Sequence, residues 1–323
     1  MKAYVVERWC EPEEMAFKDI EEPIPSEDEL LIEVRAAGIN FPDLLMIQGK
    51  YQARPKRPFT PGTEVAGIVV ACGKNTSKFR VGDRVAAISW LGGYAEKVVA
   101  KESHTYPIPA PMTFAEAAVF HVVYQSSYFG IVERANLRPP ETLLVHAGAG
   151  GIGTSSIQIG KAIGAKVYAT AGSPEKLKIT ETCGADLSLS YEDAQWSRKI
   201  RKELGGVDVV IDPVGGEVLE KSILCTNFEG RVVVVGFTSG KIAQVATNML
   251  LLNNISVMGL FWNLYAQNHP DKIQKAVSVL YQWYIEKKLS PIIYKTYSLK
   301  DAIIGLRDVT TRKSYGKAVI EIS

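Results

Sequence analysis

The sequence predicts an α/β protein in which a doubly wound parallel sheet follows a β-rich domain. Short β-type runs separated by Pro and Gly fill the chain up to about residue 120, and units of strand, glycine turn and helix follow from about Leu143. The strands of these later units are apolar throughout, which is typical of a parallel sheet covered by helices on both faces. With 323 residues and 46% hydrophobic content, the chain can bury a core in each of two domains.

The N-terminal part contains four runs that are typical of strands. They read LLIEVRAAGI, VAGIVVACG, DRVAAIS and AEKVVAK, and Pro and Gly turns separate them. We therefore expect a small β-rich domain in this part of the chain.

From Leu143 onward, buried strands alternate with helices. The expected strands read TLLVHA, AKVYATA, VDVVID, RVVVVGF and ISVMGL, and a helix over 153–164 follows the first of them. The remaining chain contains a periodic helix, DKIQKAVSVLYQWYIEKK, a second helix near LKDAIIGLRDV, and a closing strand, KAVIEIS. The alternation predicts βαβ units and hence a parallel sheet.

Charge and composition exclude several classes of protein. Charged residues make up 22% of the chain and the net charge is +2, so a basic face for nucleic acid is not expected. No apolar run reaches the ~18 residues that span a bilayer. The N-terminus MKAYVVERWC lacks the features of a signal peptide or presequence, so we expect a cytoplasmic protein without a membrane partner, although a removed presequence would leave no trace. The four cysteines and four histidines are scattered without metal-ligand spacing, which favours reduced thiols and no metal site.

Gly148, Gly150 and Gly153 form a GxGxxG motif between the strand TLLVHA and the helix that follows it. In this context the first glycine permits a tight turn, the second lets the backbone approach a pyrophosphate, and the third lets helix and strand pack closely. The helix N-terminus presents unpaired N–H groups and a partial positive charge to the phosphates. The alternative is a glycine-rich turn without a ligand. The strand and helix on either side favour a dinucleotide site.

An acidic residue that would bind a ribose 2′-hydroxyl is missing about 20 residues after the motif. The second strand instead ends at Ala171, Gly172 and Ser173, and Lys176 follows. The Ser173 hydroxyl and the Lys176 ammonium are groups that bind a phosphate. The alternative for Lys176 is a solvated lysine on the first turn of the next helix. The sequence thus predicts NADPH rather than NADH as the cofactor.

Several motifs, in order and over essentially the whole chain, resemble the medium-chain dehydrogenase/reductase superfamily. They are AGINFPDLLMIQGKY, PGTEVAGIVVACGKNTSKFRVGDRVA, GGYAEKVV, VHAGAGGIG, VDVVIDPVGG, GRVVVVGF and YGKAVIEI. Within the superfamily the chain resembles the zinc-free quinone oxidoreductase branch, which includes zeta-crystallin-like proteins. The resemblance implies a GroES-like catalytic domain over 1–122, a Rossmann NADPH-binding domain over 123–264, and a C-terminal segment over 265–323 that returns to the catalytic domain. The substrate is then expected in the cleft between the domains.

The resemblance also implies independence from zinc. In zinc alcohol dehydrogenases a cysteine ligand stands three residues before an aspartate, whereas this chain has Asn40 before Asp43. Their histidine ligand corresponds to Thr63, and their four-cysteine lobe is absent. Neither Asn nor Thr replaces a thiolate or an imidazole as a good zinc ligand. In the quinone oxidoreductase branch, the residues that match Asn40 and Asp43 line the nicotinamide side of the cleft; the alternative is that they cap a turn.

The same resemblance implies the other cofactor contacts. Gly150, Gly151 and Ile152 are expected on the pyrophosphate. The residues expected around the 2′-phosphate are Ser173, Lys176, Tyr191 and Arg312. The residues expected to flank the nicotinamide are Phe237, Ser239 and Phe261, although the two aromatic residues are equally consistent with ordinary core packing.

Tyr51 is the obvious proton donor near the expected site. In related enoyl thioester reductases a tyrosine at the matching place supplies a proton, and MIQGKY resembles their segment. The alternative is a packed aromatic residue with its hydroxyl at the surface. Ile47 and Gln48 stand where the branch often has an arginine, which leaves the identity of the substrate open.

Together these features predict an NADPH-dependent reductase of quinones or α,β-unsaturated carbonyls, with Tyr51, Asn40 and Asp43 as its catalytic residues. One alternative is an enoyl thioester reductase, in which the basic residues between 54 and 57 would bind a pantetheine phosphate. Another is a weakly catalytic NADPH-binding protein with a structural or RNA-binding role. The uncharged run NNISVMGLFW is typical of an edge strand that needs covering, and the resemblance implies that two such edges pair in a homodimer.

Overall fold

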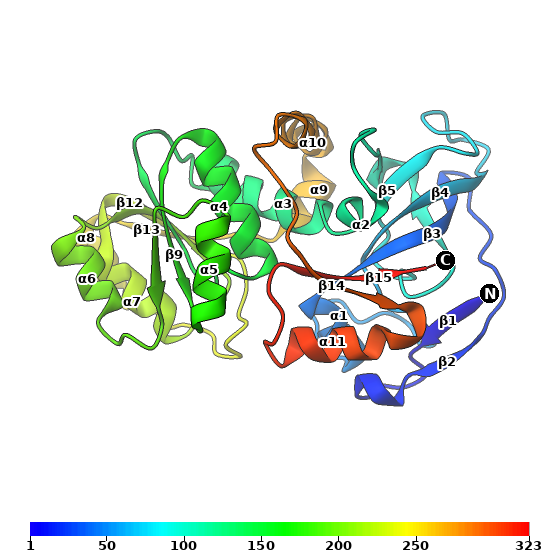
Figure 1. The fold of residues 1–323 in the computed structure, drawn as a ribbon, viewed down its shortest axis with the longest axis horizontal. Coiled ribbons are helices and arrows are strands. Elements are labelled where there is room, and N and C mark those ends of the chain that lie inside the picture. The colour runs from blue at the N-terminus through cyan, green and yellow to red at the C-terminus, as the bar shows by residue number, and fades with distance from the viewer. Residues whose placement is uncertain (323) are drawn as a thin grey trace. The chain divides into compact units, whose positions relative to one another are not determined.

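A computed structural model describes residues 1–322 and divides the chain into two compact units (Figure 1). The first unit comprises Met1–Val122 together with the C-terminal segment that begins at Pro291, and the second comprises Val123–Ser290. The segment over 265–323, expected to return to the first domain, therefore contributes to both units. Its helix α10 (Pro270–Ile285) belongs to the second unit, and its strand β15 (Lys317–Glu321) belongs to the first.

The second unit is built on a six-stranded parallel sheet with the order β10–β9–β8–β11–β12–β13. These strands are β8 (Thr142–Val145), β9 (Lys166–Ala171), β10 (Leu187–Ser190), β11 (Val207–Asp212), β12 (Thr226–Val234) and β13 (Ser256–Gly259). The first strand of the sheet lies beside the second and the fourth, which is the order of a Rossmann sheet. The predicted doubly wound sheet is thus confirmed, and the run predicted as its last strand forms the edge β13.

The second unit also contains eight helices within the described residues, and several of them pack against the sheet, whose strands are apolar on both faces. They are α3 (His121–Tyr128), α4 (Gly151–Ile163), α5 (Pro174–Thr182), α6 (Trp196–Glu203), α7 (Glu217–Cys225), α8 (Thr247–Asn253), α9 (Trp262–Asn268) and α10, and a π-helical turn over Phe129–Arg134 follows α3. Helices α4 and α5 contact β8, β9 and β10, whereas α7 contacts α6, β11 and β12. Leu144 and Val210 belong to a buried cluster with Trp196 of α6, while their neighbours Leu143 and Ile211 are also completely buried.

The first unit contains a sheet of seven strands in which β14–β15–β3–β4–β5–β7 are neighbours and β6 pairs with β3. The strands are β3 (Glu29–Ile39), β4 (Glu64–Cys72), β5 (Arg84–Ile88), β6 (Lys97–Lys101), β7 (Thr105–Pro107), β14 (Ile293–Ser298) and β15, and a separate pair is formed by β1 (Lys2–Val5) and β2 (Ala16–Asp19). Its helices are α1 (Phe41–Ile47), α2 (Phe114–Ala117) and α11 (Ala302–Thr310). The four predicted runs correspond to β3, β4, β5 and β6. Antiparallel pairing of β15 with β3 places Ala318 opposite Ile39, so the C-terminal strand lies beside the start of α1.

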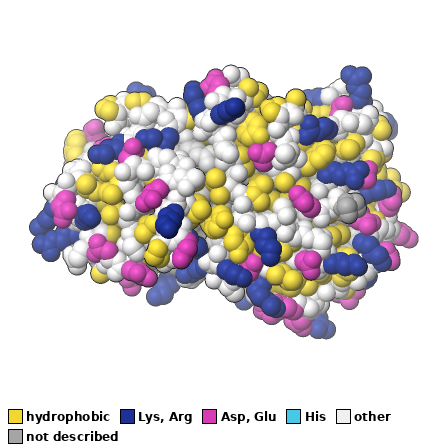
Figure 2. Space-filling model, viewed as in Figure 1, with side chains coloured by type: hydrophobic (Ala, Val, Ile, Leu, Met, Phe, Trp, Pro, Cys, Tyr) yellow, Lys and Arg dark blue, Asp and Glu magenta, His cyan; other side chains and the backbone are white. Residues whose placement is uncertain are grey.

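The surface carries both signs of charge. In Figure 2, Lys and Arg side chains are interspersed with Asp and Glu side chains over the face that is shown. Within residues 1–322, no helix has both the length and the apolar character that crossing a membrane requires.

Candidate functional site

The GxGxxG motif forms the turn that connects β8 to α4. A Cβ atom added at Gly148 would lie 2.8 Å from Thr180 Cγ2, and one added at Gly153 would lie 2.2 Å from the carbonyl oxygen of Ala147. At Gly150 the nearest heavy atom would be 3.3 Å away. Packing therefore requires the first and third glycines, whereas a side chain at the second would meet only the carbonyl oxygen of Ala147.

Helix α4 begins at this turn with Gly150 as its N-cap. The N–H of Thr154 donates to the carbonyl of Gly150 at 2.8 Å, so the preceding N–H groups of Gly151, Ile152 and Gly153 have no acceptor inside the helix. The first turn carries no acidic residue. The turn also lies at the end of β8 beside β11, where the strand order of the sheet reverses and ligands bind in such folds. A pyrophosphate fits this set of donors.

A buried polar network lies behind the turn. The His146 ring has Nδ1 at 2.8 Å from Thr170 Oγ1 and Nε2 at 2.7 Å from Ser222 Oγ. The Ser222 hydroxyl donates to the carbonyl of Val218 at 2.6 Å, so it accepts from Nε2–H, and the ring is neutral. Burial lowers the pKa of His146 to about 3. This network joins the ends of β8 and β9 to α7.

Tyr191 contacts the glycine-rich turn itself. Its hydroxyl oxygen accepts a hydrogen bond from the N–H of Ala147 at 2.7 Å, and Ala147 has a φ of 48°. Because an alanine in the left-handed region is strained, this bond helps to hold the turn. Burial raises the pKa of the Tyr191 hydroxyl, which therefore stays protonated at neutral pH. The role of Tyr191 beside a 2′-phosphate stays a prediction.

Ser173 and Lys176 lie together on the first turn of α5. The Ser173 hydroxyl caps this helix by accepting the N–H of Lys176 at 3.3 Å. An added Cβ at Gly172 would have no heavy atom within 4 Å, so the backbone before the cap is open. The N–H of Tyr191 donates to the carbonyl of Ala171 at 3.1 Å, so three of the four residues predicted around the 2′-phosphate lie near the end of β9. The fourth, Arg312, follows α11 in the other unit.

Two of the residues predicted to flank the nicotinamide lie against the turn after β11. The Ser239 hydroxyl donates to the carbonyl of Val214 at 2.6 Å, and Phe237 Cδ1 would lie 3.0 Å from a Cβ at Gly215. Phe261 caps α9 and lines a pocket of about 300 Å³. Phe237 and Phe261 are 41% and 45% exposed, so neither is a core residue of its unit.

Asn40 and Asp43 are buried at the start of α1 in the first unit. The Asp43 carboxylate accepts the N–H of Asn40 at 2.9 Å, so the turn capping considered from the sequence is present. It also accepts the hydroxyls of Thr63 at 2.8 Å and Tyr94 at 3.0 Å. Burial raises the pKa of Asp43 to about 6 although these bonds favour its charged form. Asp43 is completely buried and can influence a ligand only through its neighbours.

The Asn40 side chain lies in a second part of this cluster, which contains a buried ion pair. Lys317 Nζ is 2.9 Å from Glu64 Oε1, and the two residues are 7% and 1% exposed. The Lys317 ammonium donates to Asn40 Oδ1, and Asn40 Nδ2 donates to Glu64 Oε1 at 3.0 Å. Both ends of the Asn40 carboxamide are therefore bound by members of the ion pair.

These contacts also test whether a zinc ion fits the first unit. Asn40 and Thr63, the two residues that the resemblance matches to zinc ligands, are hydrogen-bonded to Lys317, Glu64 and Asp43. Neither Asn40 nor Thr63 offers the thiolate or imidazole that zinc prefers, and the Lys317 ammonium lies against Asn40. In the part of the chain that the structure describes, no three His, Cys, Asp or Glu side chains form a group that could hold a metal ion.

Tyr51 lies four residues beyond the end of α1, and its N–H donates to the carbonyl of Leu45 at 3.1 Å. Its side chain is partly buried, and its hydroxyl has no hydrogen-bond partner among residues 1–322. Burial raises the pKa of this hydroxyl, and the charge of Asp43 raises it further. A protonated phenol with a free hydroxyl has the chemistry of a proton donor.

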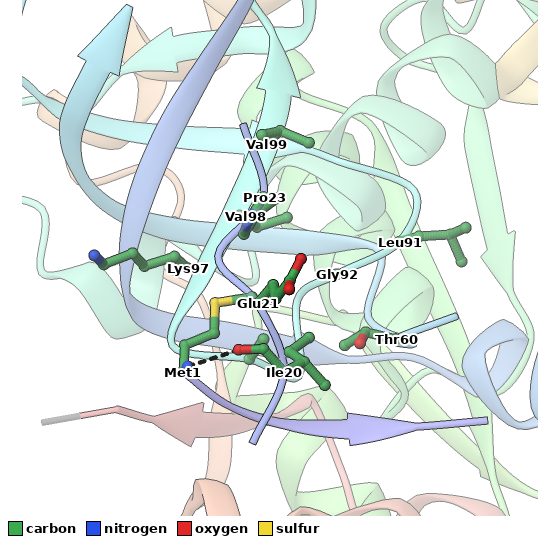
Figure 3. Close-up of a pocket in the computed structure, with 11 residues that line it drawn as sticks. Met1, Ile20, Glu21, Pro23, Thr60, Leu91, Gly92, Lys97, Val98 and Val99 are labelled. Atoms are coloured by element: carbon green, nitrogen blue, oxygen red, sulfur yellow. Dashed lines mark hydrogen bonds between the residues drawn. The ribbon is translucent and has the colours of Figure 1, made fainter. Parts of the chain in front are cut away.

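A separate pocket of about 240 Å³ lies in the first unit (Figure 3). Apolar side chains such as Ile20, Leu91 and Val98 line it, and the amino group of Met1 donates to the carbonyl of Ile20 at 2.8 Å. None of the residues that line this pocket is a predicted site residue, so the pocket is not the predicted site.

Sequence reasoning missed the polar residues that support the site. Lys317, at the start of the apolar strand KAVIE, could have indicated such a residue, because a lysine in a buried strand requires polar partners. Its partners could not be identified, because Asn40 lies 277 positions away in the chain. His146 follows the first strand of the motif directly, but its neutral state depends on Thr170 and Ser222, which the fold brings to it.

Comparisons with known proteins agree with this architecture. Residues 26–110 match the alcohol dehydrogenase GroES-like domain, and residues 151–280 match the zinc-binding dehydrogenase family. The quinone oxidoreductase-like protein 2 of Bos taurus is 38% identical over 297 residues, which cover 91% of this chain and 85% of the relative.

Solved structures of similar fold include a quinone oxidoreductase and an enoyl reductase. The quinone oxidoreductase of Escherichia coli, solved with NADPH, has a TM-score of 0.92 and 27% identity, covering 99% of this chain and 100% of that one. The CurK enoyl reductase has a TM-score of 0.90 and 25% identity, covering 100% of this chain and 99% of that one. This chain has these sequence relatives and pairs a GroES-like domain with a Rossmann domain. It therefore belongs to the quinone oxidoreductase family of the medium-chain dehydrogenase/reductase superfamily.

Proposed function

We propose that this protein is a cytoplasmic, homodimeric reductase that transfers hydride from NADPH to quinones or other α,β-unsaturated carbonyls without zinc. The observation that carries the proposal is the glycine turn at the sheet reversal, with Ser173 and Lys176 at the position where an NADH enzyme would carry an acid. The NADPH complex of the similar E. coli quinone oxidoreductase supports the same cofactor.

The residues of the chain bind and orient, while bound NADPH supplies the hydride. The N–H groups of Gly151 and Ile152 bind the pyrophosphate. The side chains of Ser173 and Lys176 bind the 2′-phosphate. Those of Asn40, Phe237, Ser239 and Phe261 surround the nicotinamide, so that binding fixes the distance and angle for transfer.

Independence from zinc is part of the proposal. Asn40 and Thr63 stand at the positions of zinc ligands, and the Lys317 ammonium lies against Asn40. We therefore expect purified protein to contain no stoichiometric zinc and chelators to leave its activity unchanged. One zinc per chain, together with activity that chelators abolish, would show that the protein uses a metal.

The decisive experiment compares three substrate classes in one NADPH oxidation assay: benzoquinones, simple enones and crotonyl thioesters. Turnover of quinones or enones with NADPH, and much weaker turnover with NADH, supports the proposal. Turnover of thioesters alone supports an enoyl thioester reductase. NADPH binding without turnover of any class supports a binding protein with another role.

The enoyl reductase is the second candidate because the Tyr51 hydroxyl has no hydrogen-bond partner within residues 1–322 and the fold is shared with the CurK enoyl reductase. A positioned proton donor contributes about 10²-fold or more when the transition state needs the proton, and little when solvent supplies it. Tyr51→Phe should therefore lower turnover of enones and thioesters far more than turnover of a good quinone, with NADPH affinity unchanged. Equal losses on all substrates would indicate a displaced cofactor, and no loss on any would leave Tyr51 a packing residue.

A further inference from the structure

The ion pair of Lys317 and Glu64 lies inside the first unit, where charges are costly. Removing an ion from water costs several kcal/mol even after the protein relaxes, and a well-packed apolar pair is often as stable or more stable. The ammonium has a partner for each of its three hydrogens: the carbonyl of Ile39 at 3.0 Å, Asn40 Oδ1, and Glu64 Oε1 at 2.9 Å. The other carboxylate oxygen of Glu64 accepts the N–H of Val122 at 3.1 Å.

The pair determines the orientation of the Asn40 carboxamide. Its oxygen faces the ammonium and its nitrogen faces the carboxylate, so a flipped amide would direct N–H at Lys317 and C=O at Glu64. Both flipped contacts are repulsive in a site from which water is excluded. Neutral side chains could also form hydrogen bonds with the Asn40 carboxamide, but they would oppose its flipped orientation less strongly than the ion pair does.

We infer that Lys317 and Glu64 are positioning residues that hold the Asn40 carboxamide in one orientation for the reaction. The inference rests on the proposed function, in which Asn40 lines the nicotinamide side. Lys317 and Glu64 act through Asn40 alone, since their own polar atoms are bound to protein groups.

The test uses Lys317→Met, Glu64→Gln and the double variant. Lys317→Met leaves the Glu64 carboxylate buried without its partner, so both the unfolding temperature and kcat should fall. The double variant removes both charges and should regain stability over Lys317→Met, yet it still lacks the donor to Asn40 Oδ1. Its kcat should stay low by a factor on the order of ten to a hundred, the cost of a misplaced reacting group, while the Kd for NADPH changes less. Arg307→Met is the matched control because Arg307 pairs with Glu13 at the surface of the same unit.

A second readout does not depend on activity. The Asn40 carboxamide, identified in 15N NMR spectra by its loss in Asn40→Ala, should exchange its hydrogens slowly in the wild type and faster in both Lys317→Met and the double variant. If the wild type reduces no substrate, the proposed function fails, and this exchange still tests the positioning. The inference is overturned if kcat recovers together with stability in the double variant, or if the carboxamide exchanges equally in all variants.

Discussion

Acid should destabilise the second unit through His146, which is completely buried there. Its Nε2–H donates to Ser222 and its Nδ1 accepts from Thr170, so the folded protein holds the ring neutral. Burial lowers the pKa of His146 to about 3, whereas the pKa in an unfolded chain is about 6.5. Since the unfolded state binds this proton more readily, the stability that the neutral ring contributes is present above about pH 6.5 and is lost as pH falls.

The expected size follows from the linkage between proton binding and folding. Each pH unit between the two pKa values is worth about 1.4 kcal/mol, so lowering the pH from 7 to 5 should cost the second unit about 2 kcal/mol through this residue. In the first unit His121, also buried with a pKa lowered to about 3, acts in the same direction. Asp43 opposes it there: its pKa is raised to about 6, so its contribution to stability grows as pH falls from about 6 toward about 4.

The assay is urea unfolding of the wild type and His146→Gln at pH 7 and pH 5. The variant should be less stable at pH 7, and the difference in unfolding free energy should shrink by about 2 kcal/mol at pH 5, because glutamine does not titrate. His269→Gln is the control, since His269 is exposed. A difference between wild type and His146→Gln that stays constant across this pH range would refute the neutral, buried histidine.

Three further outcomes test the cofactor site and the assembly. Lys176→Ala should weaken NADPH binding by about 1.5 to 3 kcal/mol, the usual value of a hydrogen bond to a charged group, and barely change NADH binding; fluorescence titration with equal losses for both cofactors would show that Lys176 acts on the fold. Tyr191→Phe leaves the N–H of Ala147 without its acceptor, so it should lower the unfolding temperature and weaken NADPH and NADH by similar factors; a loss confined to NADPH would assign the hydroxyl to the 2′-phosphate instead. Light scattering at micromolar concentration should give a dimer of the 35.4 kDa chain, because β13 is an edge of its sheet; a monomer would contradict this prediction.

The fold could be predicted because its signals are local. Apolar strands, glycine turns and helices follow one another within short stretches, so the sequence indicates both the elements and the parallel sheet. The glycine motif is also a local signal. Gly148, Gly150 and Gly153 lie within one turn, and their roles follow from the strand before them and the helix after them.

The support of the site could not be predicted because its partners are distant in the chain. Asn40 and Asp43 were expected to face a ligand, yet both also have structural partners that only the folded sheet brings near, among them Lys317 and Tyr94. Tyr191 was assigned through the resemblance, whereas its bond to Ala147 depends on how β10 and β8 are placed. The spacing and composition of a sequence do not show which residues become hydrogen-bond partners across a sheet.

The buried charges of the first unit bear on which substrates suit the enzyme. Burial and the Asp43 carboxylate both raise the pKa of Tyr51, so its phenol is a weaker acid than a free tyrosine and keeps its proton through the neutral range. Such a donor transfers a proton readily only to a strongly basic atom, such as the α-carbon of the enolate that forms when a hydride adds to the β-carbon of the substrate. A quinone, whose product can take protons from solvent, gains little from it. Within the proposed function, the environment of Tyr51 thus suits α,β-unsaturated carbonyls better than quinones, although relatives such as the quinone oxidoreductase-like protein 2 of Bos taurus are named after quinones.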